Sequence, residues 1–159
     1  MIFTDEAALV TLNDIPVGNL ALGFGYGHQG MPFLISAEEG AKSLFRLRGE
    51  FYTVQDDYRT RLLDLGPPAA RFDVESAIAE DKAPDDGTLM FSPDGPGVFE
   101  NSNHIRPSWG YITLLSGARK QFYRERDTPA FATWEIGYLR EQEFVRVATI
   151  DAHQNRLSR

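Results

Sequence analysis

Cysteine is absent from the 159-residue chain, and this absence removes several kinds of chemistry at once. Disulfides, thiolate nucleophiles, cysteine-ligated zinc and iron–sulfur clusters are excluded, and the composition fits a reducing compartment. The opening residues, MIFTDE, lack the basic and apolar regions of a signal peptide, and no apolar run approaches the roughly 18 residues that span a membrane. We expect a cytoplasmic protein, or part of a particle assembled in the cytoplasm, that is not secreted through a signal peptide and does not contact a membrane.

Histidine is scarce, since the chain has only His28, His104 and His153. No two of them are close enough in sequence to begin a metal site. The motifs of phosphate-binding loops, zinc proteases, serine hydrolases and EF-hands are absent as well. We therefore predict no metal and no cofactor, and we lean against catalysis. His28 and His104 are the two candidates for a catalytic general base, although a hydrogen-bonded structural role is favoured for each.

Basic residues are outnumbered, with 16 Lys and Arg against 23 Asp and Glu and a net charge of −7. This balance argues against direct nucleic-acid binding, which needs cations to replace the counterions of the phosphates. The acids are concentrated in residues 73–100, where eight acidic residues accompany one base, Lys82. The segment is either a solvated acidic region or a surface that meets basic residues of a partner.

Glycines near the start of the chain match a known spacing, because Gly25, Gly27 and Gly30 fit the G-x-G-x-x-G pattern of dinucleotide-binding loops. That pattern requires a helix to begin at the third glycine. The residues that follow, MPFLI, predict an extended segment instead. The first helix start is at Ser36, which forms a capping box with Glu39. We therefore reject a dinucleotide site.

Residues 20–27 alternate between two kinds of side chain, which is typical of a β-strand. Large apolar residues take the even positions and small residues the odd ones, in the order Leu20, Ala21, Leu22, Gly23, Phe24, Gly25, Tyr26 and Gly27. One face of the strand would be nearly bare, and a bare face allows another backbone or ring to approach closely. We predict that a second copy of the chain docks there.

The whole chain predicts an α+β fold, mainly an antiparallel sheet of the sandwich or barrel-like kind, in a single domain of residues 1–159. Further strands are expected over residues 44–54, 109–115, 131–139 and 144–150, the last two joined as a hairpin. Two to four short helices are expected, with starts and stops that favour residues 36–43, 56–65, 74–81 and 117–126. The strand assignment of residues 109–115 stays ambiguous, because Tyr111, Leu114 or Leu115, Ala118 and Phe122 also lie at helical spacing.

Residues 82–100 are richer in proline, glycine and aspartate than their surroundings and predict a hairpin arm that protrudes from the body. Two turn sequences, PDDG and PDGPG, bracket a short run of strand-forming residues. An isolated acidic hairpin of this length supports itself poorly. We expect the arm to reach a basic patch on a neighbouring molecule through Asp85, Asp86 and Asp94.

Candidate binding residues fall into two groups. Arg46, Arg48 and Tyr52 share the polar face of the strand predicted over residues 44–54 and would hold a phosphate or a carboxylate, as would Arg106 in the polar loop NSNHIR. The interface candidates combine aromatic and apolar residues with acids of the arm. They are Leu22, Phe24, Tyr26, Asp85, Asp86, Asp94, Trp109 and Trp134.

These patterns favour a non-enzymatic subunit that acts by protein–protein contact in a larger assembly, for example a phage particle, with copies of itself or neighbouring subunits as partners. Two alternatives stay open. One is an acidic binding inhibitor, such as a toxin-immunity or anti-defence protein, whose residues 73–100 occupy a cationic site. The other is a small-molecule enzyme or binder, with a pocket lined by His28, Tyr26, Arg46, Arg48 and His104.

Overall fold

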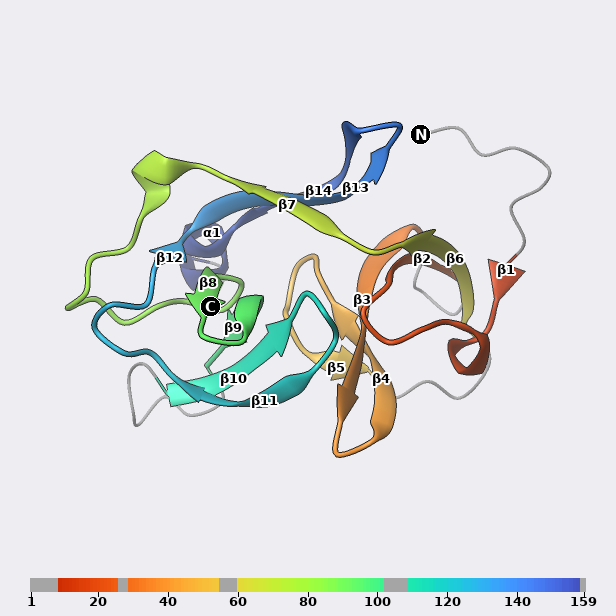
Figure 1. Cartoon of the computed structure of the whole chain (residues 1–159), viewed down its shortest axis with the longest axis horizontal. Coiled ribbons are helices and arrows are strands. Elements are labelled where there is room, and N and C mark those ends of the chain that lie inside the picture. Colours follow the sequence, from red (N-terminus) through yellow and green to blue (C-terminus); the bar gives the residue numbers. More distant parts are fainter. Residues whose placement is uncertain (1–8, 26–28, 55–59, 102–108, 158–159) are drawn as a thin grey trace.

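The computed structural model describes residues 9–25, 29–54, 60–101 and 109–157. These residues form mostly antiparallel β-sheet, arranged as a six-stranded, a five-stranded and a three-stranded sheet (Figure 1). Each sheet has an edge strand at both ends of its order, so the sheets are open and none closes into a barrel. The predicted antiparallel sheet is confirmed, and the barrel form is not.

The six-stranded sheet has the order β1-β6-β2-β3-β4-β5. Its strands are β1 (Leu9–Val10), β2 (Leu20–Phe24), β3 (Met31–Glu38), β4 (Ala41–Arg46), β5 (Thr53–Val54) and β6 (Arg61–Gly66). The predicted strand at Leu20 is confirmed, and it lies between β6 and β3 in the interior of the sheet. A strand, not a helix, follows Gly30, which agrees with the rejection of a dinucleotide site.

The five-stranded sheet has the order β11-β10-β9-β8-β12. Its strands are β8 (Leu89–Ser92), β9 (Gly95–Glu100), β10 (Trp109–Leu114), β11 (Arg119–Tyr123) and β12 (Ala130–Phe131). The hairpin expected within residues 82–100 exists as β8 and β9, but it does not protrude. Both strands are interior strands, and Leu89, Met90, Val98 and Phe99 are buried. Asp85, Asp86 and Asp94, the acids assigned to the arm, lie outside the strands, whereas most side chains of the strands are apolar and belong to the core.

The three-stranded sheet has the order β14-β13-β7. Its strands are β7 (Ala69–Phe72), β13 (Thr133–Arg140) and β14 (Glu143–Asp151), and the short helix α1 (Ala152–Leu157) follows. The predicted hairpin near the end of the chain is therefore confirmed. Its ladder shifts by one residue between Ile136 and Gly137, which marks a β-bulge.

The expected helices are wrong for the part of the chain that the structure describes. Besides α1, it contains only the 3-10 turns η1 (Leu12–Asp14) and η2 (Val74–Ser76). The segment expected to be a helix at residues 36–43 is the β3–β4 hairpin, and β6 and β11 take the place of two others. In β6 both faces are covered, since Leu62 and Leu65 pack into different apolar clusters, and a strand covered on both faces loses its simple alternation.

The largest apolar cluster joins all three sheets at their meeting point. It takes residues from each sheet, namely Leu20, Leu34, Phe45, Leu47, Phe51, Leu89, Val98, Trp134, Ile136 and Ile150. Trp134 is 1% exposed, and its indole Nε1 donates a hydrogen bond of 2.7 Å to the carbonyl of Gly87. Burial of Phe45, Leu47 and Phe51 confirms the apolar face predicted for residues 44–54, although β4 ends at Arg46. None of the described helices has the length and apolar character needed to cross a membrane.

Candidate functional site

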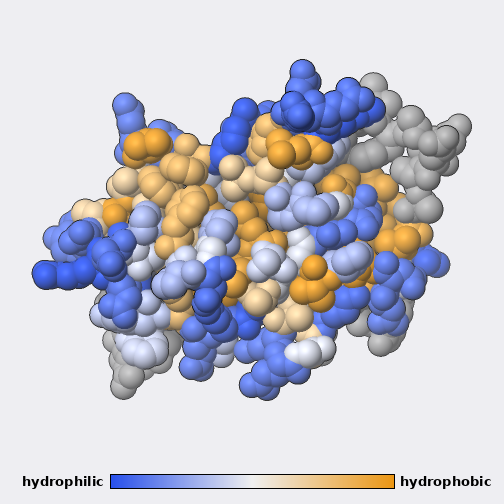
Figure 2. Space-filling view, in the orientation of Figure 1, coloured by the Kyte–Doolittle hydropathy of each residue, from blue (hydrophilic) through white to orange (hydrophobic). Residues whose placement is uncertain are grey.

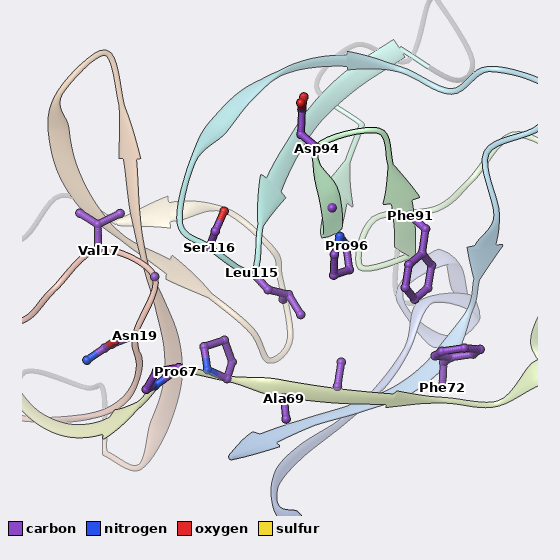
Figure 3. Close-up of a pocket in the computed structure, with 14 residues that line it drawn as sticks. Val17, Asn19, Pro67, Ala69, Phe72, Phe91, Asp94, Pro96, Leu115 and Ser116 are labelled. Atoms are coloured by element: carbon purple, nitrogen blue, oxygen red, sulfur yellow. The ribbon is translucent and has the colours of Figure 1, made fainter. Parts of the chain in front are cut away.

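A groove of about 610 Å³ lies where the three sheets meet (Figure 3). Four segments that are distant in sequence line it: Val17, Gly18 and Asn19 before β2; Pro67, Pro68, Ala69, Ala70 and Phe72 in and before β7; Phe91, Asp94, Gly95 and Pro96 in the β8–β9 hairpin; and Leu115 and Ser116 after β10. Most of these side chains are apolar or small. The groove is therefore mainly apolar, and its glycine, proline and alanine residues leave backbone atoms close to its surface.

One wall of the groove is formed by the connection from β6 to β7. Gly66 has a φ of 78°, a conformation that glycine adopts at little cost, and Pro67 and Pro68 follow it. Proline cannot donate a backbone hydrogen bond, so the chain leaves the six-stranded sheet here and enters the three-stranded sheet as β7. The small side chains of Ala69 and Ala70 then leave room beside the backbone.

The opposite wall is held by local hydrogen bonds in the β8–β9 turn. The hydroxyl of Ser92 donates to the carbonyl of Gly95 at 2.8 Å and accepts from the backbone N–H of Asp94 at 3.2 Å. The backbone N–H of Leu115 donates to the carbonyl of Pro96 at 3.0 Å, which ties the two neighbouring turns together. In Figure 3 Pro96 and Leu115 point across the groove towards β7.

An aromatic cluster closes one end of the groove. The ring centroid of Phe72 lies 5.3 Å from that of Phe91 and 4.4 Å from that of Phe131. Phe72 is nevertheless 41% exposed, and Val17 at the other end of the groove is 39% exposed. Apolar residues cover much of this face of the molecule between hydrophilic margins (Figure 2). Large exposed apolar patches are common at binding surfaces and ligand grooves, so we take this groove as the candidate site.

The groove carries little charge. Asp94 is the one ionisable residue among the described residues that line it, and it forms an ion pair with Lys120. At one end Asn19 donates a hydrogen bond of 2.9 Å to the carboxylate of Asp64, and at the other end Asp73 follows β7 directly. The lining thus offers apolar contact and backbone groups, with carboxylates near both ends.

A buried ion pair lies elsewhere, between β9 and β11. The guanidinium of Arg119 is 2.8 Å from the carboxylate of Glu100 and 3.7 Å from that of Glu38, and it stacks 4.5 Å from the ring of Tyr111. Burial raises the pKa of the Glu100 carboxyl above 4.5, and the nearby charge of Arg119 opposes this rise. Glu100 and Arg119 belong to the five-stranded sheet, and Glu38 belongs to β3 of the six-stranded sheet. Because Arg119 joins the two sheets, we interpret the cluster as a structural clamp.

The predicted anion-binding residues are partly brought together. The Arg46 guanidinium donates to the hydroxyl of Tyr52 at 3.0 Å and to the carbonyl of Arg48 at 2.8 Å. Arg48 in turn donates to the carbonyl of Gly30 at 3.5 Å. This cluster lies outside the groove lining, and its anion binding stays a prediction. Four further candidates, His28, Tyr26, His104 and Arg106, lie outside the described residues.

The predicted interface strand does not present a bare face. Ala21 is fully buried and Gly23 is buried as well, because the small side of β2 is covered by the chain's own apolar cluster. This cluster consists of Leu12, Ile15, Ala21, Met31, Phe33, Ile35, Leu44 and Leu62. Leu22 and Phe24 are half-buried on the other positions of this interior strand. A second copy therefore has no access to Ala21 and Gly23, whereas Gly25 is exposed.

The remaining interface candidates are spread over the molecule. Trp134 is a core residue, whereas Trp109 is 44% exposed and packs against Tyr123 with ring centroids 5.1 Å apart. The acids of the expected arm have partners within the chain. The carboxylate of Asp85 lies 3.7 Å from His153, Asp86 accepts from the backbone N–H of Asn101 at 2.7 Å, and Asp94 pairs with Lys120.

The groove itself was not predicted from the sequence. The signal was present in the stretch GPPAARF at residues 66–72, of which we interpret only Gly66, Pro67 and Pro68, as the stop after a helix over residues 56–65. Within the ranges that the structure describes, no group of His, Asp or Glu side chains is arranged to hold a metal ion. Comparison of the chain with models of known protein families, with curated proteins and with solved structures found no match in any of the three.

Proposed function

We propose that the protein is a non-enzymatic interaction subunit that binds a protein partner along the groove between its sheets. The observation that carries this proposal is the lining: among the described residues that form it, Asp94 is the one ionisable residue, and most of the others are apolar or small. Acid–base or nucleophilic chemistry needs several polar groups that converge on one point. Protein interfaces instead favour apolar contact with aromatic residues at the centre.

Exposed apolar side chains at the aromatic end support the same conclusion. Phe72 is 41% exposed and Val74, two residues further on, is 70% exposed. Leaving such side chains in water is unfavourable, and a partner that covers them gains about 25 cal/mol for each Å² of apolar surface removed from water. The inhibitor alternative receives less support, because Asp85, Asp86 and Asp94 already have partners within the chain.

The test uses charge substitutions at the two ends of the groove. Phe72→Arg and Val17→Arg each place a cation in the apolar channel, whereas Leu139→Arg changes a residue that is 63% exposed and does not line it. The variants are expressed in the cells from which the gene comes, and a gentle lysate is separated by size. We expect the wild type and Leu139→Arg to elute in a complex much larger than the 17.9 kDa chain.

Both groove variants are expected to shift to the size of the free chain, because an unpaired charge in an apolar interface is costly. Unfolding midpoints of the purified variants show whether each one is folded. Elution of the wild type at the size of a single chain would contradict the proposal. So would large complexes that both folded groove variants retain.

A further inference from the structure

We propose that the partner supplies an extended segment that adds to the free edge of β7 as a fourth strand of the three-stranded sheet. This inference rests on the proposed function and specifies how the groove is filled. β7 ends the strand order of its sheet, and among the described residues no strand pairs with its other edge. An unpaired edge offers a row of backbone donors and acceptors to an incoming chain.

The pairing of β7 with β13 shows which backbone groups of β7 are free. Phe72 lies opposite Trp134. The next two residues, Asp73 and Thr133, are a hydrogen-bonded pair, because the N–H of Asp73 donates to the carbonyl of Thr133 at 3.0 Å. Backbone groups of an antiparallel strand point alternately to one neighbour and to the other. The N–H and C=O of Ala70 and Phe72 therefore point away from β13.

These free groups belong to residues that line the groove. Ala69, Ala70 and Phe72 form one wall, and Pro96 and Leu115 lie opposite them. In Figure 3 β7 runs between β13 and these opposing residues. At about 3.3 Å per residue, the four residues of β7 give an edge roughly 13 Å long. A segment of similar length can pair there and place alternate apolar side chains against Pro96 and Leu115.

The charges around the groove indicate a basic segment from a different protein. Carboxylates stand near both ends, with Asp64 beside Asn19 and Asp73 directly after β7, and Asp94 lies on the opposite wall. Residues 73–100 have eight acids and one base, a net charge of −7, and the chain as a whole also carries −7. A second copy would bring the same negative charge, whereas Lys or Arg flanking an apolar core would complement it.

The experiment begins with selection of displayed random peptides of twelve residues on the full chain. Enriched peptides are expected to carry apolar residues at alternate positions with Lys or Arg beside them. The tightest synthetic peptide is then added to ¹⁵N-labelled protein, and amide hydrogen exchange is measured by NMR. We expect exchange at Ala70 and Phe72 to slow by at least about tenfold. Ala69 and Arg71, whose amides face β13, serve as the internal control.

A pair of variants tests the backbone bond separately. Ala70→Pro removes an N–H that points away from β13 at the free edge of β7, and an edge strand tolerates proline at such a position. Ala70→Ser keeps that N–H with a side chain of similar size. We expect the peptide to bind Ala70→Pro at least about tenfold more weakly than Ala70→Ser, the loss of about one hydrogen bond. Unfolding curves of both variants verify that the fold is intact.

Failure of the inference is distinguishable from failure of the proposed function. Binding that Phe72→Arg abolishes, without slower exchange at Ala70 and Phe72, would overturn strand addition while the groove remains a protein-binding surface. Selection of no groove-dependent peptide, or of acidic peptides only, would also overturn the inference. The proposed function falls separately, if the native complexes do not depend on the groove.

Discussion

At the scale of single residues, two tight turns place non-glycine residues at positive φ, a conformation that their side chains disfavour. Glu141 and Gln142 connect β13 to β14 with φ values of 51° and 68°. A two-residue hairpin turn with two positive φ values is of type I′, for which Asn-Gly is preferred. Glu39 and Gly40 have φ values of 51° and 84° and connect β3 to β4 in the same way. The apparent capping box at Ser36 was therefore a hairpin.

The Glu141 turn gives a stability prediction. Replacing Glu141 by Asn and Gln142 by Gly supplies residues that adopt positive φ at lower cost. We expect the free energy of unfolding to rise by about 1–2 kcal/mol in the double variant. Urea denaturation measures this change, and Gly40→Ala, which makes the corresponding change in reverse, is expected to lower the same quantity. An unchanged or reduced stability of the double variant would contradict the turn assignment.

At the scale of elements, the clamp between β9 and β11 predicts a dependence of stability on pH. Burial raises the pKa of Glu100 in the folded protein above 4.5, so the folded state binds this proton more tightly than the unfolded chain does. The stabilisation from the protonated form is complete below pH 4.5. It is lost as the pH rises through the pKa of the folded state.

In the variant Glu100→Gln the side chain at position 100 is neutral at every pH, so this variant does not lose stability through ionisation at that position. The free energy of unfolding of the wild type, minus that of Glu100→Gln, is expected to fall between pH 4 and pH 7. Urea denaturation of both proteins at several pH values measures the difference. Arg119→Gln removes the charge that opposes the rise of the Glu100 pKa, so in its background the fall should extend to higher pH. A difference that is constant or increases with pH would contradict the account.

The elements that could be predicted from the sequence are those whose alternation reflects one covered face. The β13–β14 hairpin and the buried side of residues 44–54 are examples. Alternation fails where both faces are covered, as in β6, and there the apolar residues imitate helical spacing. The groove could not be predicted from the sequence, for a reason unrelated to the alternation of side chains. Its walls come from four separated segments, and their meeting depends on how three sheets pack together.

At the scale of the whole molecule, a net charge of −7 is combined with a groove that is mainly apolar. The excess of negative charge opposes the approach of a second copy of the chain, and the proposed basic partner would bind the apolar surface of the groove. The sequence pointed to protein–protein contact through β2 and an acidic arm. In the structure β2 is an interior strand and the arm is part of a sheet. The proposed contact therefore moves to the groove beside β7.

The most direct test of this contact is site-specific photo-cross-linking. A benzophenone amino acid replaces Phe72 in the groove or, as the control, Leu139 on the far end of β13, and the protein is irradiated in the cells from which its gene comes. The account predicts a cross-link from position 72 to a different protein, through a segment with basic and apolar residues, and no such product from position 139. No protein cross-link at position 72, or the same products from both positions, would contradict it.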